Sequence, residues 1–133
     1  MSDHNLFTFI RLIRTINRDV RKQWNFYLSS PQIQLLESLN VEGPKKMSDL
    51  ANELGITVGA MTALADRMHK AGIISRERSS SDRRVIHLVI TEKGKELVGD
   101  ISRARSSTLE KYFGKLTEEE TTLMLDLCNK MLK

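Results

Sequence analysis

Residues 46–91 read KMSDLANELGITVGAMTALADRMHKAGIISRERSSSDRRVIHLVIT, and this stretch decides the fold. Near its start Ser48 is expected to cap a helix, since a serine hydroxyl can accept a hydrogen bond from the backbone there. Gly55 is expected to end that helix, because glycine adopts the left-handed backbone of a sharp stop without steric penalty. The short helix that these signals predict buries Leu50, Ala51 and Leu54.

A second helix follows at once. Thr57 is expected to cap it, and Gly72 is expected to close it. Its apolar face repeats at helical spacing through Met61, Leu64 and Met68. Small residues between the two caps allow the helices to cross closely and leave the outer face of the second helix exposed. The pattern predicts a helix-turn-helix that binds duplex DNA.

Two short strands are expected after the second helix, at Ile74–Arg78 and Val85–Ile90, because apolar and other residues alternate there with the period of a sheet. The polar segment between them ends in Arg83 and Arg84. Residues 61–90 carry six Lys and Arg against three Asp and Glu, in a chain of net charge +4. A basic cluster on one compact unit suits a phosphate backbone, with a solvated surface loop as the alternative.

The regions on either side predict long helices. Residues 5–28 form an amphipathic pattern that is apolar on more than one side, and residues 92–133 predict two further helices. A small domain cannot bury so much apolar helix surface alone, so we expect a partner subunit. We expect a single domain, residues 1–133, in which 5–28 and 92–133 are dimerisation helices and 31–90 form the winged helix-turn-helix DNA-binding region.

Three further helix starts have recognisable signals. Ser30 followed by Pro31 predicts a cap with proline in the first turn. Thr91 can cap the helix that follows the strands. Thr117 precedes three glutamates, one of them at the capping-box position, which predicts the start of the last helix.

The composition is that of one ordinary globular domain. Its 133 residues are 40% hydrophobic and 29% charged, enough for a core without disulfides. No apolar run approaches the roughly 20 residues of a membrane-spanning helix, and the first residues lack a signal-peptide pattern. The single cysteine, Cys128, fits a reducing compartment and is expected to be buried and unreactive. We therefore expect a cytoplasmic protein with no membrane partner.

Beyond these patterns, the chain from about Leu6 to Leu132 resembles the multiple-antibiotic-resistance regulator (MarR) family of bacterial transcription factors. The most specific segments are SDLANELGI followed by TVGAMTALADRM, AGIISR, SDRR and HLVITEKG. The resemblance implies six helices, a two-stranded wing and dimerisation through the first and last helices. It also implies binding to palindromic operators, with release in many members when a small molecule or an oxidant acts.

Two departures from the family pattern matter. Ala63 stands where members often have a basic or polar residue, so direct base contacts by this helix are expected to be few. The oxidant-sensing members carry a cysteine in the first helix, and this chain has none there. Peroxide sensing of that kind is not expected.

The predicted DNA contacts fall on three elements. On the recognition helix, threonines can bond a base edge or phosphate and pack on thymine methyls, although they can equally be a cap and plain surface. The recognition-helix candidates are Thr57, Val58, Gly59, Thr62 and Arg67, the last as a phosphate clamp or as the partner of a nearby acid. The candidates for backbone contacts at the preceding helix are Lys45, Lys46 and Ser48.

The wing carries the third set of contacts. Arginine inserts into narrow minor grooves, where the potential is most negative, so Arg83 and Arg84 are expected there. By resemblance, Arg84 matches the arginine at the wing tip of the family. Asp82 is expected to orient an arginine, because a carboxylate facing phosphates would be repelled. The alternative is a solvated hairpin tip.

Trp24 and Tyr27, near the end of the first helix, are candidates for a pocket that takes a small apolar or aromatic effector. Plain packing in a dimer core is the alternative interpretation, because a regular apolar stripe needs no ligand to explain it. The histidines His4, His69 and His87 are scattered, and none has metal-ligand spacing with Cys128. With no phosphate-binding glycine loop or nucleophile elbow, we expect no enzyme, no cofactor and no metal.

The sequence thus predicts a sequence-specific double-stranded DNA-binding transcriptional regulator. We expect it to be a repressor that acts as a homodimer on a palindromic operator and is released by a small-molecule effector. The alternative is a winged-helix protein-interaction module without specific DNA binding. The basic wing argues against that alternative, because protein-binding winged helices usually present apolar or acidic faces.

Overall fold

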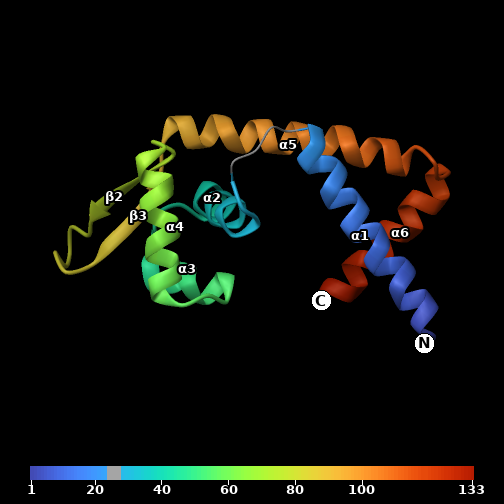
Figure 1. The fold of residues 1–133 in the computed structure, drawn as a ribbon, viewed down its shortest axis with the longest axis horizontal. Helices are drawn as coiled ribbons and strands as arrows, with labels where there is room; N and C mark the ends of the chain where they lie inside the picture. The colour runs from blue at the N-terminus through green and yellow to red at the C-terminus, as the bar shows by residue number, and fades with distance from the viewer. Residues whose placement is uncertain (24–27) are drawn as a thin grey trace. The chain divides into compact units, whose positions relative to one another are not determined.

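The computed structural model describes residues 1–23 and 28–133. The described residues form six helices and a small antiparallel sheet, which confirms the predicted fold class (Figure 1). In chain order the elements are α1 (Asp3–Gln23), α2 (Ser30–Glu42), β1 (Lys45–Lys46), α3 (Met47–Leu54), α4 (Val58–Lys70), β2 (Ile74–Arg78), β3 (Ile86–Ile90), α5 (Glu92–Phe113) and α6 (Glu118–Leu132).

Contacts divide the chain into two compact units. The central unit is Tyr27–Ile101, and the terminal unit combines Met1–Phe26 with Ser102–Lys133. The long helix α5 begins in the central unit and ends in the terminal one. The sequence predicts that the DNA-binding region ends at residue 90, before this helix. In the structure the first turns of α5 belong to the central unit, together with the winged helix-turn-helix.

Helix α2 begins one residue earlier than its proline suggests. Ser29, rather than Ser30, occupies the N-cap position, and its backbone N–H donates to Gln32 Oε1 at 2.8 Å. This bond satisfies one of the amide groups that a helix start leaves without a partner. The buried residues of α2 are Gln32, Leu35, Leu36 and Leu39.

The turn between α3 and α4 forms as predicted. Gly55 has φ 65° and ψ 32°, the left-handed conformation that ends α3. Thr57 caps α4, and its Oγ1 accepts a hydrogen bond from the Ala60 backbone N–H at 3.1 Å. The predicted cap at Ser48 is wrong, because α3 already starts at Met47. Lys46 remains in extended backbone at the N-cap position, so the helix can only begin after it.

The sheet has the strand order β1-β3-β2. Its hairpin pairs Ile74 with Ile90 and Arg78 with Ile86, close to the predicted strand bounds. The resemblance implies two strands, whereas the structure has a third, because Lys45 and Lys46 pair with Leu88 and His87. A two-residue strand is too short to show a period in the sequence.

The core of the central unit lies where these elements meet. Leu88 of β3 is fully buried, and it packs in one cluster with residues of α2, α3 and α4. The largest members of that cluster are Leu35, Leu36, Leu39, Leu50, Met61, Met68, Ile73 and Ile74. Because the apolar faces of α3 and α4 are used here, the outer face of α4 is left to solvent.

The start of α5 and the residue before it hold the two residues that follow α4. Thr91 Oγ1 donates to the Gly72 carbonyl at 2.7 Å, and Lys93 Nζ donates to the Ala71 carbonyl at 2.7 Å. Gly94 approaches so closely that a Cβ there would lie 2.2 Å from the carbonyl oxygen of Ile73. These contacts explain why the start of α5 belongs to the central unit.

In the terminal unit, the predicted start of α6 is confirmed. Thr117 Oγ1 accepts from the Glu120 backbone N–H at 3.1 Å, and the Thr117 N–H donates to Glu120 Oε1 at 2.9 Å. Tyr112 of α5 donates its hydroxyl to the Asp19 carboxylate of α1. This bond is the largest influence that lowers the pKa of Asp19 and raises that of Tyr112.

The terminal helices bury little within the protomer. Neither Asp3–Gln23 nor Glu118–Leu132 contains a buried residue. Cys128, which we expected to be buried, is half-buried. The large apolar side chains exposed on these helices are Leu6, Phe7, Phe9, Ile10, Ile13, Leu123, Leu125, Leu127, Met131 and Leu132.

Candidate DNA-binding interface

The outward side of α4 begins with the predicted recognition residues. The Thr57 hydroxyl accepts the cap bond, and the Thr62 hydroxyl donates to the Val58 carbonyl at 2.9 Å. Each hydroxyl can still form a hydrogen bond to DNA, because Thr57 can still donate and Thr62 can still accept. Val58 is 58% exposed, and the nearest atom to a Cβ on Gly59 would be Thr57 Oγ1 at 4.0 Å. This surface can approach a base edge closely.

Arg67 is exposed in the last turn of α4. The acid beside it in the sequence, Asp66, forms an ion pair with Arg76 of β2 instead. Within residues 1–23 and 28–133, Arg67 forms no ion pair of its own. Of the two roles expected for Arg67, this geometry favours the phosphate clamp.

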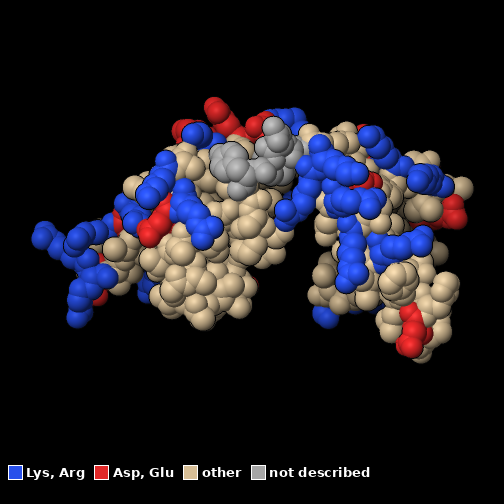
Figure 2. Space-filling view, in the orientation of Figure 1, with Lys and Arg blue, Asp and Glu red and all other residues tan. Residues whose placement is uncertain are grey.

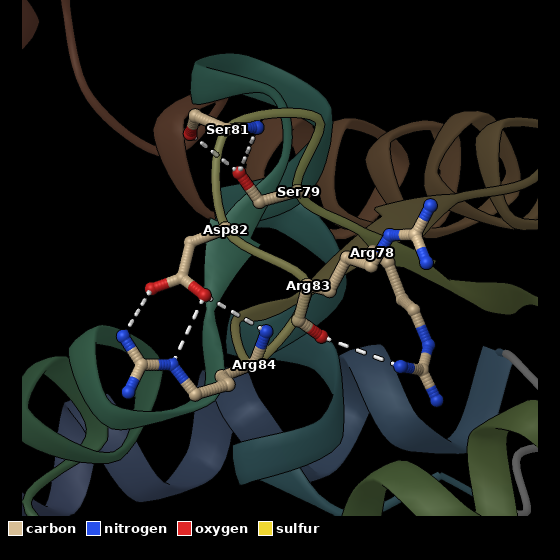
Figure 3. A network of polar contacts seen from close by, with 6 residues as sticks. All are labelled: Arg78, Ser79, Ser81, Asp82, Arg83 and Arg84. Atoms are coloured by element: carbon tan, nitrogen blue, oxygen red, sulfur yellow. Dashed lines mark hydrogen bonds and ion pairs between the residues drawn. The ribbon is translucent and has the colours of Figure 1, made fainter.

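The hairpin tip holds Arg84 in one orientation (Figure 3). Asp82 Oδ1 accepts from the Arg84 backbone N–H at 3.0 Å and from Arg84 Nε at 3.2 Å, and Oδ2 accepts from Arg84 Nη2 at 3.4 Å. The backbone bond is the first cause that lowers the pKa of Asp82, followed by the side-chain bond. The Arg84 side chain is nevertheless 90% exposed, so its cation is both oriented and accessible.

Arg78 and Arg83 lie on the other side of the tip from Arg84 (Figure 3). Arg78 Nη1 donates to the Arg83 carbonyl at 3.4 Å, which ties β2 to the loop. The loop is closed by two backbone bonds, from Ser79 N–H to the Val85 carbonyl at 2.9 Å and from Val85 N–H to the Asp82 carbonyl at 3.1 Å. Figure 2 shows Lys and Arg side chains gathered at this end of the hairpin.

The three predicted backbone-contact residues have different surroundings. The Lys45 side chain is only 13% exposed and pairs with Glu42 and Glu53. Lys46 is exposed, and its charge contributes to the lowered pKa of Asp82 in the wing. Ser48 is exposed in the first turn of α3. Lys46 and Ser48 are accessible to a phosphate, while Lys45 is turned inward.

Two features of this surface are not evident from the sequence. Arg76 joins β2 to α4 through Asp66, and Arg78 braces the loop through Arg83. Both arginines stand in the basic segment that the sequence singles out, but nothing in the sequence specifies these partners, because they depend on the hairpin register. The predicted effector residues Trp24 and Tyr27 lie outside the described residues.

The terminal unit contains a small pocket of about 220 Å³. Thr108 lines it, is 1% exposed, and its hydroxyl has no hydrogen-bond partner among the described residues. The other lining residues are Asp19, Lys22, Gln23, Lys111 and Tyr112. The pocket combines an unpartnered hydroxyl, two ammonium groups and the Asp19 carboxylate, which accepts a hydrogen bond from Tyr112.

Residues 1–23 and 28–133 contain neither a metal-binding cluster nor a membrane-spanning helix. No group of three or more His, Cys, Asp and Glu side chains there could hold a metal ion. No helix in this part of the chain is long and apolar enough to cross a membrane.

The comparisons with known proteins agree on one family. The family model described as MarR family matches residues 28–86. The HTH-type transcriptional regulator MgrA of Staphylococcus aureus is 32% identical over 114 residues, which cover 78% of this chain and 76% of MgrA. The HTH-type transcriptional repressor MdtR of Bacillus subtilis is 34% identical over 89 residues, 67% of this chain and 57% of MdtR.

A solved structure extends the likeness over almost the whole chain. The crystal structure of the YusO protein from Bacillus subtilis superposes with a TM-score of 0.79 and 26% identity. The match covers 99% of this chain and 98% of YusO. The helix-turn-helix, the basic hairpin and these relatives together show that the chain belongs to the MarR family of winged helix-turn-helix, DNA-binding transcriptional regulators and is not an enzyme.

Proposed function

We propose that the protein is a homodimeric repressor that binds a palindromic operator. Each protomer places α4 in a major groove and the tip of its β2–β3 hairpin in the adjacent minor groove. The observation that carries this proposal is Arg84, an exposed cation that Asp82 orients, in the same compact unit as the exposed outer face of α4. A guanidinium fixed in this way suits a narrow minor groove, where the potential is most negative.

The terminal helices support a dimer. Side chains as large as Phe7 and Leu127 are half or more exposed in the protomer, and neither α1 nor α6 has a buried residue. Burying such surface contributes about 25 cal/mol per Å² of apolar area, so a second copy of the chain would stabilise these helices substantially. Twofold symmetry of the protein would then require twofold symmetry of the operator.

Repression is supported by similarity. MdtR, to which this chain is similar, is named a transcriptional repressor. A dimer that occupies two successive major grooves and the flanking minor grooves covers enough duplex to exclude another protein from the same site. We therefore favour repression over activation.

Selection of binding sites from a random duplex library tests the proposal. We expect an inverted repeat whose half-sites are about 34–36 Å apart, bound by two protomers per duplex. Recovery of a single asymmetric site bound by one protomer would contradict the dimeric arrangement. Absence of any salt-dependent binding to duplex DNA would favour a protein-interaction module instead.

A second, smaller proposal concerns release from DNA. The unpartnered Thr108 hydroxyl favours a polar effector in the terminal pocket, and the ammonium groups of Lys22 and Lys111 outnumber the one carboxylate of Asp19, which Tyr112 already engages, so we favour a small aromatic anion. Benzoate is the simplest probe of that class. We expect benzoate to raise the melting temperature of the wild-type protein more than that of Thr108→Val, and equal shifts would contradict this site.

A further inference from the structure

Lys45 is surrounded by partners from two helices. Its Nζ lies 2.5 Å from Glu42 Oε2 at the end of α2 and donates to Ser38 Oγ at 3.1 Å. It also forms an ion pair with Glu53 in the last turn of α3. Ser38 Oγ in turn donates to Glu53 Oε2 at 2.8 Å, which closes the network. The ammonium group therefore joins α2, α3 and the strand that carries it.

The charges in this network favour its formation. Hydrogen bonding to Glu42, and then to Glu53, raises the pKa of Lys45 above its ordinary value. The bond from Lys45 is the largest influence that lowers the pKa of Glu53. Both groups are therefore charged at neutral pH. A cation that is already satisfied by two carboxylates has little to gain from a phosphate.

The strand that Lys45 anchors connects the wing to the helix-turn-helix. Lys45 and Lys46 pair with Leu88 and His87 of β3, the strand that carries one side of the hairpin. The chain enters α3 directly at Met47. Any shift of β1 must therefore move the hairpin relative to α3 and the helix packed on it.

Lys46 offers a natural contrast. It has the same charge and the next position in the chain, but successive residues of a strand point to opposite faces. Lys46 is exposed, and its charge acts on Asp82 at the wing tip rather than on the acids around Lys45. Two adjacent lysines are thus placed for different tasks.

We propose that Lys45 is a positioning residue. Held by Glu42 and Glu53, it fixes the distance between the wing and the recognition helix without touching DNA. The inference rests on the proposed insertion of the wing. It predicts that loss of the network reduces the preference for the operator, because the wing and α4 no longer match their two grooves together. Binding that depends only on phosphate charge is left unchanged.

The matched variants Lys45→Met and Lys46→Met test this inference. Each is titrated with the tightest duplex recovered by selection and with a random duplex of equal length, over a range of salt. We expect Lys45→Met to lose about tenfold in operator affinity, the loss expected for one misplaced groove contact. Its affinity for the random duplex and its salt slope should stay as in the wild type. Lys46→Met should weaken both duplexes and flatten the slope by about 0.9 per lost contact.

Glu53→Gln distinguishes a positioning role of Lys45 from a DNA contact, because it removes a partner and leaves Lys45 in place. The two roles predict opposite changes in DNA binding. Positioning predicts that Glu53→Gln loses operator preference as Lys45→Met does. A DNA contact by Lys45 predicts the opposite, since the released ammonium and the lost negative charge would strengthen binding to both duplexes. All titrations are run well below the melting temperature of each variant, so that a change in stability alone leaves the ratio of operator to random affinity unmoved.

Three results would overturn the inference. They are a flattened salt slope in Lys45→Met, tighter binding by Glu53→Gln, and an unchanged ratio of operator to random affinity in both variants. A different pattern marks failure of the proposed function itself, namely a wild-type protein that prefers no selected duplex, or a wild-type operator affinity in Arg84→Ala. In either case the positioning role falls with the wing contact.

Discussion

Arg84 is the residue on which the proposed DNA contact depends most. It is almost fully exposed, yet hydrogen bonds to Asp82 hold both its backbone and its guanidinium. A side chain that is already ordered loses less conformational entropy when it enters a groove. Arg83, with the same charge in the preceding position, lies on the other side of the tip (Figure 3).

We expect Arg84→Ala to weaken operator binding by about tenfold or more and to flatten the salt dependence by roughly one unit of slope per lost contact. Arg83→Ala removes the same charge and should have the smaller effect, because Asp82 does not orient that side chain. Fluorescence anisotropy titrations at several salt concentrations measure both variants. Equal losses in the two would contradict the assignment of Arg84 as the groove contact.

Asp82 should act through Arg84. Because the folded pKa of Asp82 is lowered, its carboxylate contributes fully above its ordinary pKa, and this contribution is lost as pH falls through the lowered value. At neutral pH the group is charged, so its titration should leave operator affinity constant from about pH 6 to 8. Asp82→Asn should lower the ratio of operator to random affinity while binding to random duplex is kept or strengthened. An unchanged ratio would show that Asp82 does not orient the arginine.

For single residues, the sequence predicts the role correctly where the partners are close in the chain. The cap at Thr57, the capping box at Thr117 and the stop at Gly55 all depend on neighbours within four positions. Lys45 shows the limit, because its partners lie on α2 and α3 and meet only when those helices pack. The sequence suggests a phosphate contact there, whereas the structure shows a network within the protein.

Among the elements, the start of α5 is fastened to the residues that follow α4. Thr91 and Lys93 donate to the carbonyls of the two residues just after α4, and Gly94 lies directly against Ile73. A helix that runs on into the terminal unit is thus fastened to the end of the recognition helix.

Gly94→Ala should destabilise the protein by about 1–3 kcal/mol, the usual range for an overpacked core position. The added Cβ would lie 2.2 Å from the Ile73 carbonyl oxygen and 2.7 Å from Ile90 Cγ1, and the former is backbone that cannot easily move. Gly59→Ala is the matched control, because its Cβ would meet only Thr57 Oγ1, at 4.0 Å, and the change should stabilise the helix by a few tenths of a kcal/mol. Urea unfolding measures both. A Gly94→Ala variant as stable as the wild type would contradict this packing.

Elements whose apolar residues repeat with the period of a helix or a strand were predictable from the sequence, and elements without such a repeat were not. The helices and the hairpin strands follow from apolar spacing and glycine stops, with bounds correct to a few residues. The two-residue strand β1 shows no period, and it also moves the start of α3 from the predicted cap to Met47. The extension of the central unit to Ile101 depends on the packing of Gly94, which spacing alone cannot show.

For the whole molecule, the exposed terminal helices are the main observation. The apolar side chains of α1 include Leu6, Ile10 and Ile13, which recur on one side of the helix and are 42–44% exposed. A protein with this surface uncovered would associate. The sequence predicts this surface correctly, and its coverage by a second copy stays a prediction.

Ile13→Glu should therefore disrupt the dimer, because it places a charge among apolar side chains that a partner would bury. Thr8→Glu adds the same charge on the polar side of the same helix and should leave the dimer intact. Sedimentation velocity at micromolar concentration distinguishes the two outcomes. A wild-type protein that sediments as a stable folded monomer would refute the dimer altogether.

The most direct measurement is a salt titration of the wild-type protein with the selected inverted repeat and with random duplex of the same length. We predict that two protomers bind each repeat, that the repeat is preferred by about a thousandfold or more at physiological salt, and that both affinities fall steeply as salt rises. Equal affinity for the two duplexes would contradict a sequence-specific regulator. Affinity that does not change with salt would contradict binding through the basic hairpin.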